Sequence, residues 1–269
     1  MRPSTQLIIT RRSQNCARIG IRATSGPPFL RLNAELTFPE RAPMHQVIAT
    51  IDRPSPDLIA RYKAAMREVV TENLPRSQLM DPAIKPLANR DWSIVGPAVT
   101  VKIETFDHLM SIAALGVVQP GDVIVIAANG HLNSAVWGGG LTLSAKHLGV
   151  EAVIVDGAVM DTRAILAREV PVWCRGSYPA HGTWEKPGSV NVPVSAGGVI
   201  VNPGDIILGD LDGVIVVPRA DVEKIIIPCE EKTKQLLERR KNLIATQGTL
   251  FQIRGGKEFI KSKGVEWVE

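Results

Sequence analysis

The run of apolar residues at 152–155, followed by Asp156-Gly157, constrains the fold more than any other feature of this chain. Continuous apolar runs of this length are typical of a strand buried on both faces. Asp-Gly favours a turn, so the strand is expected to end there. A second carboxylate, Asp161, follows where a helix is expected to begin. This arrangement predicts a hard oxygen ligand at the edge of a sheet, where α/β proteins hold their ligands.

The segment Gly138-Gly139-Gly140-Leu141 begins thirteen residues before Glu151, at the expected start of another helix. Backbone N–H groups at the start of a helix can bind an anion. The alternative is a flexible link between a strand and a helix. Next to the strand and Asp161, the glycines favour a site for a carboxylate.

Strands and helices alternate along the chain, which predicts an α/β fold with helices packed on a sheet core. Helical periods, caps and glycine stops predict helices over 55–69, 106–117, 134–148, 161–168 and 221–248, the last kinked or split at Pro228. Apolar runs predict strands over 94–103, broken by Gly96-Pro97, and over 123–128, 151–156, 170–174, 189–195, 198–201, 205–209 and 213–217. Residues 176–188 are expected to form a loop, either a plain surface loop or one that closes over a site.

Composition excludes several classes of protein. Cys16, Cys174 and Cys229 are odd in number and lack CxxC spacing, which argues against a disulfide framework and for a reducing compartment such as the cytoplasm. No apolar run reaches the roughly 18–20 residues of a membrane span. The net charge is +4, but residues 1–43 hold seven Arg and two Glu, so the remainder carries about −1. This near-neutral remainder argues against a nucleic-acid binder.

Residues 1–43 differ from the rest of the chain in being rich in Arg, Ser and Thr and poor in acids. Three interpretations remain open: a mitochondrial-type transit segment, a disordered tail, or a translation start placed upstream of Met44. Residues 44–248 are expected to form one domain with helical extensions at both ends. Residues 249–269 are expected to be a polar C-terminal tail.

Several short motifs then follow one another in the order of a known family. They are Pro120-Gly121-Asp122, residues 135–141 (AVWGGGL), residues 149–161 (GVEAVIVDGAVMD), residues 193–199 and residues 203–214. Over roughly residues 80–220 the chain resembles a divergent member of the RraA-like family. That family includes 4-hydroxy-4-methyl-2-oxoglutarate (HMG/CHA) aldolases and regulators of ribonuclease activity. The resemblance implies an αββαβ-type sandwich core, assembled into homotrimers or hexamers with sites between subunits.

The aldolases of this family are metal-dependent lyases that cleave 4-hydroxy-2-oxo acids to pyruvate and a second carbonyl compound. The resemblance implies that Asp161 binds a divalent cation, Mg²⁺ or Mn²⁺. It also implies that the backbone N–H groups of Gly138, Gly139, Gly140 and Leu141 hold the carboxylate of a small 2-oxo acid.

The family signature is an Asp, twenty intervening residues, and then Arg-Asp. Here Gly139 stands in place of the first Asp and Met160 in place of the Arg. The family's Asp orients a water molecule and its Arg binds the substrate carboxylate. Losing one such electrostatic stabiliser typically costs about 10²–10³ in rate. Efficient cleavage of the usual substrate therefore needs other groups to compensate.

Two residues are the candidate catalytic substitutes. His131, just after the strand 123–128, is a candidate base in place of the missing Asp. Arg175, at the end of a later strand, is a candidate carboxylate ligand in place of the missing Arg. Met160 is expected to line the substrate site.

Three functions remain open at this point. The first is a metal-dependent lyase that performs retro-aldol cleavage or the related decarboxylation of a 2-oxo diacid. The second is a non-catalytic regulator that acts through protein contacts, which the two missing side chains favour. The third is a metal-dependent enzyme on a different carboxylate, with His131 or His181 as the base.

Overall fold

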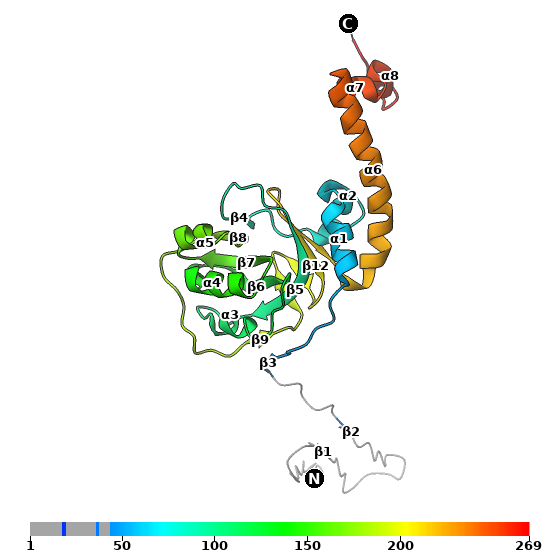
Figure 1. Ribbon diagram of the computed structural model, residues 1–269. Coiled ribbons are helices and arrows are strands. Elements are labelled where there is room, and N and C mark those ends of the chain that lie inside the picture. Colours follow the sequence, from blue (N-terminus) through cyan, green and yellow to red (C-terminus); the bar gives the residue numbers. More distant parts are fainter. Residues whose placement is uncertain (1–17, 20–35, 38–43, 269) are drawn as a thin grey trace, which may run out of the picture. The chain divides into compact units, whose positions relative to one another are not determined.

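The computed structural model describes residues 18–19, 36–37 and 44–268, shown in colour in Figure 1. The interpretations of residues 1–43 therefore fall almost wholly outside the described residues. The chain divides into two units, Met1–Met44 and His45–Glu269. In the first unit, Arg18–Ile19 (β1) pairs antiparallel with Leu36–Thr37 (β2).

A nine-stranded mixed sheet forms the centre of the second unit, in the order β13-β12-β5-β6-β7-β8-β4, with β9 joining β5 to β3. Its middle strands are parallel: Ile94–Lys102 (β5), Val123–Trp137 (β6), Ala152–Val159 (β7) and Val172–Ser177 (β8). The flanking strands are Gln46–Val47 (β3), Lys85–Pro86 (β4), Ser189–Val190 (β9), Ile206–Gly209 (β12) and Val214–Val217 (β13). Val194–Ala196 (β10) and Val199–Val201 (β11) form a separate hairpin. This mixed α/β architecture confirms the predicted fold class.

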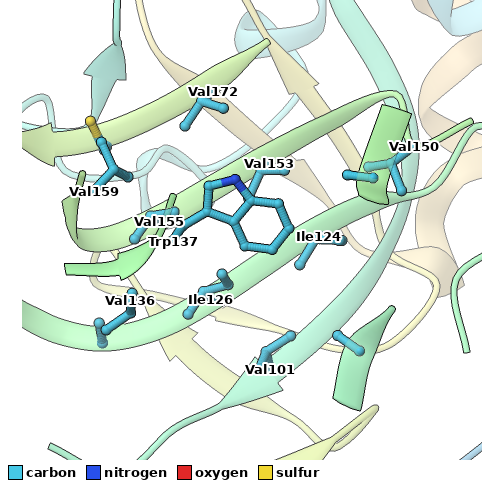
Figure 2. Close-up of a cluster of buried hydrophobic side chains, with 14 of the residues drawn as sticks. Val101, Ile124, Ile126, Val136, Trp137, Val150, Val153, Val155, Val159 and Val172 are labelled. Atoms are coloured by element: carbon cyan, nitrogen blue, oxygen red, sulfur yellow. The ribbon is translucent and has the colours of Figure 1, made fainter. Parts of the chain in front are cut away.

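Three short helices connect the parallel strands and cover one face of the sheet (Figure 1). They are Leu109–Ala114 (α3), Gly139–His147 (α4) and Thr162–Arg168 (α5). Alternate residues of the strands pack against these helices, because successive side chains of a strand point to opposite faces. Figure 2 shows this cluster, with Trp137 lying among Ile124, Ile126 and Val153. The opposite face of the sheet packs against the β10–β11 hairpin.

A second group of helices packs against the edge strand β13 and its neighbour β12. It comprises Pro56–Ala64 (α1), Arg67–Glu72 (α2) and Val222–Thr246 (α6), and it has its own buried apolar cluster. The remaining helices are Arg76–Gln78 (η1), Arg219–Asp221 (η2), Leu250–Ile253 (α7) and Gly256–Lys261 (α8). No helix among the described residues is long and apolar enough to cross a membrane.

The strand that contains Asp156-Gly157 does not end at that pair, so the predicted turn was wrong. β7 continues to Val159 and keeps its pairing with β8. A Cβ atom on Gly157 would lie 2.7 Å from the Cβ of Ala128 and 3.0 Å from the carbonyl oxygen of His131. Glycine at this position therefore permits the close approach of β6 rather than a change of chain direction.

Several predicted boundaries also differ. β5 runs unbroken through Gly96-Pro97, where a Cβ on Gly96 would collide with the carbonyl oxygen of Gly121. The helix predicted from residue 134 begins at Gly139, because residues 134–137 belong to β6 and pair with β7. The strand predicted over 189–195 is divided between β9 and β10. α6 continues through Pro228 without being split, and the predicted tail contains α7 and α8.

Candidate active site

A pocket of about 200 Å³ opens at the carboxyl ends of the four parallel strands. Each strand is followed by residues that line it: His108 after β5, Gly138 after β6, Asp161 after β7, and His181 and Trp184 after β8. The other lining residues are Ala135, Val136, Trp137, Gly140, Leu141 and Met160. Open α/β sheets bind their ligands at this end of the strands.

The start of α4 forms one side of the pocket. Gly138 is its N-cap and Gly139 its first residue. The first N–H groups of an α-helix have no partner within the helix and carry a partial positive charge. Trp137 Nε1 donates to Thr142 Oγ1 at 2.8 Å, and that hydroxyl donates to the carbonyl oxygen of Gly138 at 2.9 Å. These bonds hold the first turn in place without using the N–H groups of Gly140 and Leu141, which could bind a carboxylate.

Asp161 stands opposite this helix start and is exposed. Its backbone is left-handed, with φ 57° and ψ 38°, a conformation that Asp adopts more readily than most residues. It precedes α5, but its side chain does not cap that helix. Its Oδ2 instead accepts a hydrogen bond from Gly139 N at 3.3 Å. The carboxylate therefore lies beside the N–H groups of the other helix, in the pocket.

The donor set fits a cation held mainly by water and substrate. Among the described residues, no three His, Cys, Asp or Glu side chains gather into a group that could hold a metal ion. Asp161 is the carboxylate among the residues that line the pocket. Mg²⁺ commonly binds through one or two carboxylates, several waters and substrate oxygens. Asp161 could hold such an ion, whereas a site built wholly from this chain's side chains does not fit.

Gly139 and Met160 both lie next to Asp161. A Cβ on Gly139 would lie 2.8 Å from the Cβ of Ala164 on α5, and a Cβ on Gly138 would lie 3.1 Å from Met160 Cγ. Helices α4 and α5 therefore approach too closely at this point for a side chain at position 139. Met160 also borders a neighbouring hollow of about 210 Å³, together with Asp161 and Tyr178.

The loop after β8 forms the wall of the pocket and is held there by Asp107. This side chain is 1% exposed, and its Oδ2 accepts hydrogen bonds from Thr183 Oγ1 at 2.6 Å, Glu185 N at 2.8 Å and Lys186 N at 3.0 Å. Burial acts to raise the pKa of Asp107, but these bonds outweigh it and lower the pKa. Two residues of this loop, His181 and Trp184, line the pocket, and closure of the loop over a site stays a prediction.

His108 is a pocket residue that sequence reasoning missed, whereas Trp184 belongs to the 176–188 loop, which was expected to lie at the surface or over a site. His108 is 9% exposed, and its Nδ1 is enclosed without a hydrogen-bond partner in the described part of the chain. Burial lowers its pKa, and the facing His181 lowers it further. A buried polar atom left unpaired is uncommon and marks a position worth explaining. An Asp-His pair that ends twelve residues before a Pro-Gly turn carries no recognisable signal on its own.

The two predicted catalytic residues are not among the residues that line the pocket. His131 borders a separate small hollow, with its ring 4.5 Å from that of Phe106. Arg175 is occupied by two carboxylates: its Nε donates to Asp156 Oδ1 at 2.5 Å and its Nη1 to Asp81 Oδ2 at 2.8 Å. Asp156 Oδ2 also accepts from Gly197 N at 2.9 Å. These contacts tie β7 and β8 to the β10–β11 hairpin, and the catalytic roles of His131 and Arg175 stay predictions.

The remaining predicted site residues are brought together. Gly138, Gly140, Leu141, Met160 and Asp161 all line the same pocket, and Gly139 is joined to Asp161 by its N–H group. Their roles toward a substrate or a metal, and assembly into trimers or hexamers, stay predictions as well.

Known proteins share much of this sequence. A protein of Halalkalibacterium halodurans, provisionally named a 4-hydroxy-4-methyl-2-oxoglutarate aldolase, is 38% identical over 176 residues, which is 65% of this chain and 83% of the relative. A Deinococcus radiodurans protein with the same provisional name is 30% identical, over 53% of this chain and 88% of its own length. These names support a lyase-like function at the level of the family.

The fold also matches solved structures. The crystal structure of Streptomyces coelicolor RraAS2, described as an unusual member of the RNase ES inhibitor RraA protein family, aligns with a TM-score of 0.64 and 27% identity. The alignment covers 71% of this chain and 99% of that one. The family model described as Aldolase/RraA matches residues 65–216. The chain therefore belongs to the RraA-like family.

Proposed function

We propose that this protein is a divalent-metal-dependent carbon–carbon lyase that acts on a small 2-oxo acid. One observation carries the proposal: the pocket brings the N–H groups at the start of α4 beside the Asp161 carboxylate, with 3.3 Å between Gly139 N and Asp161 Oδ2. The helix start binds the substrate carboxylate, and Asp161 holds Mg²⁺ or Mn²⁺ next to it. The provisional aldolase names of the relatives support the same reaction class.

The chain's own residues position the substrate for bond cleavage. Gly140 and Leu141 present N–H groups to the carboxylate, and the exposed position of Gly140 leaves room for it. Trp137, Leu141 and Met160 limit the access of water around the reacting carbons. When bound, the metal ion supplies a Lewis acid that polarises the 2-oxo group. Retro-aldol cleavage and decarboxylation both leave an enolate of pyruvate, so one site serves either reaction.

Pyruvate release tests the proposal. The substrates are oxaloacetate and 4-hydroxy-4-methyl-2-oxoglutarate, each with Mg²⁺, Mn²⁺ or EDTA, and the proteins are wild type, Asp161→Asn and Asp212→Asn. Asp212 is an exposed aspartate on a turn away from the pocket and serves as the matched control. We expect metal-dependent release by wild type and Asp212→Asn, and a loss of about 10²-fold or more in Asp161→Asn. Release that persists in EDTA or in Asp161→Asn contradicts the proposal.

A second candidate function is a regulator that works through protein contacts. The structure of RraAS2 is described as that of a member of the RNase ES inhibitor RraA protein family, and this chain lacks side chains at position 139 and a guanidinium at position 160. A regulator of this kind keeps its partner binding in EDTA and in Asp161→Asn. If no carboxylate substrate yields pyruvate, this function replaces the first. Activity on a different carboxylate, with none on these two substrates, favours a third function, that of a metal-dependent enzyme with another carboxylate substrate.

A further inference from the structure

Two imidazoles and an indole gather on the part of the pocket wall that is formed by residues after β5 and β8. The ring centroids of His108 and His181 are 5.7 Å apart, and those of His108 and Trp184 are 5.6 Å apart, both edge to face. His181 and Trp184 stack, with 5.8 Å between centroids and 12° between planes. All three residues line the pocket, and none of them takes part in the lyase chemistry proposed above.

The tautomer of neutral His181 follows from its surroundings. Its Nδ1 lies 2.6 Å from the carbonyl oxygen of Gly182. A carbonyl oxygen can only accept, so Nδ1 carries the hydrogen and Nε2 keeps a lone pair. A histidine held in this way can accept a proton at Nε2 without first changing its tautomer.

The stack on Trp184 also favours the product of such a transfer. An imidazolium over the face of an indole is attracted by the negative charge of the ring face, at centroid distances up to about 6 Å. A competing positive charge on His108 is disfavoured, because burial and the facing His181 lower its pKa. The wall thus supports a positive charge that forms on His181.

The loop that carries His181 is fixed rather than free. Asp107 binds Thr183, Glu185 and Lys186, and His108 N donates to the carbonyl oxygen of Thr183 at 2.9 Å. Ala135 N on β6 donates to the carbonyl oxygen of Ala180 at 2.9 Å. These bonds hold the segment on both sides of His181 against the core, which is what a positioned base requires.

We propose that His181 is the general base of this site, taking at Nε2 the hydroxyl proton of a 4-hydroxy-2-oxo acid bound at the start of α4. This inference rests on the proposed function. His181 performs the proton transfer that the family's signature Asp would assist. Gly139, which stands in place of that Asp, has no side chain and cannot assist it. His108 and Trp184 are positioning residues that hold the ring.

His181 alone can both remove the hydroxyl proton and return it to the product. Loss of the hydroxyl proton to Nε2 lets the C4–O group become a carbonyl, and the C3–C4 bond breaks. Its electron pair goes to the pyruvate fragment as an enolate. The imidazolium then returns the same proton to C3, which gives pyruvate and restores the neutral base.

The ionisable groups nearest to His181 come from several elements. At the start of α3 they are His108 and Asp107, and before α5 the pocket is lined by Asp161. Its own loop carries Glu185 and Lys186, whose backbones are bound to Asp107. The pH profile of wild type must therefore be compared with those of one variant that removes the His181 imidazole and one that removes a distant imidazole.

The test compares wild type, His181→Gln and His147→Gln. His147 is an exposed histidine in the last turn of α4, away from the pocket, and is the matched control. The readouts are kcat and KM for metal-dependent pyruvate release against pH, the affinity for oxalate as an analogue of the pyruvate enolate, and the proton position on the His181 ring by ¹H–¹⁵N NMR.

We expect kcat of His181→Gln to fall by about 10²–10⁴, with KM and the oxalate affinity within threefold of wild type. The loss of kcat at acidic pH, where an imidazole takes up a proton, should vanish in His181→Gln and remain in His147→Gln. NMR should show the proton of the neutral ring on Nδ1. A kcat within fivefold of wild type, an unchanged pH profile, or a proton on Nε2 overturns the assignment. If wild type itself releases no pyruvate, the proposed function has failed, and the assignment falls with it.

Discussion

The Asp161 carboxylate accepts a hydrogen bond from the backbone N–H group of Gly139, with 3.3 Å between Oδ2 and N. This contact joins the turn after β7 to the first residue of α4, across twenty-two positions of sequence. It places a carboxylate, the proposed metal ligand, beside a helix start that attracts anions. The proposed chemistry depends on this relationship more than on any other.

Gly139 is required by packing, so restoring a side chain there should destabilise the protein. We expect Gly139→Ala to lower the free energy of unfolding by about 1–3 kcal/mol, because its Cβ meets the Cβ of Ala164 at 2.8 Å. Gly140→Ala is the matched control, since a Cβ there meets nothing within 4 Å. Urea unfolding of both variants measures the difference. Equal stability of the two variants would contradict the close approach of α4 and α5.

The same contact predicts a rescue. Ala164→Gly removes the opposing Cβ, so the double variant Gly139→Ala/Ala164→Gly should recover part of the stability that Gly139→Ala loses. Strict additivity of the two single changes would show that the residues do not touch, because contacting residues couple and distant ones do not.

Met160 occupies the position at which the family carries an Arg, and Met160→Arg should strengthen carboxylate binding. A guanidinium there lies beside the pocket and can bind a carboxylate bidentately. We expect the dissociation constant for oxalate, measured by calorimetry, to fall about tenfold, equivalent to about 1.4 kcal/mol. Met160→Leu is the control and should leave it within twofold. An unchanged affinity in Met160→Arg argues against carboxylate binding at this position.

We expect Arg175 to contribute to the stability of the fold more than to substrate binding. Its partner Asp156 is 5% exposed, so Arg175→Met leaves a buried carboxylate without its cation. Breaking such a pair from one side typically costs about 3–5 kcal/mol. Arg163→Met, on the exposed surface of α5, is the control. In the double variant Arg175→Met/Asp156→Asn, much of the lost stability should return. A stable Arg175→Met protein with lost oxalate binding would instead support the direct role in substrate binding predicted for Arg175.

The lowered pKa of His108 predicts a loss of stability at mildly acidic pH. Because burial and His181 lower its pKa in the folded protein, the unfolded chain, with a pKa of about 6.5, takes up the proton first as pH falls. The stability contributed by neutral His108 is therefore complete above that pH and declines below it, until the folded pKa is passed. Urea unfolding midpoints across this range should decline less in His108→Phe than in wild type and His147→Phe. The same decline in all three proteins would contradict a buried neutral His108.

Much of the central sheet was predictable because buried strands have a local signature. The apolar runs at 94–103 and 151–156 correspond to β5 and β7, and Gly149 follows the end of α4 as expected. The end of β7 was misplaced, because Asp156-Gly157 has the composition of a turn while Gly157 serves a close approach between strands. That approach depends on Ala128, far away in sequence, and leaves no local trace.

The candidate site was predictable only in part, for the same reason. The glycines at the start of α4 and Asp161 lie close together in the sequence. Their spacing resembles that of the family signature. Asp107 and His108 follow β5, and the loop they bind begins some seventy residues later, after β8. Their contact arises from the order of strands in the sheet. Arg175 was predicted to bind a substrate carboxylate, and its contacts with Asp156 and Asp81 were not predictable because these residues come together only in the folded chain.

Mn²⁺ binding tests the central claim most directly. Titration of wild type, Asp161→Asn and Asp212→Asn, followed by EPR with and without oxalate, reports on the metal and on the carboxylate site together. We predict one Mn²⁺ site per chain in wild type and Asp212→Asn, tightened by oxalate, and its loss in Asp161→Asn. Equal Mn²⁺ binding by Asp161→Asn and wild type, with or without oxalate, would contradict a metal-dependent site at Asp161.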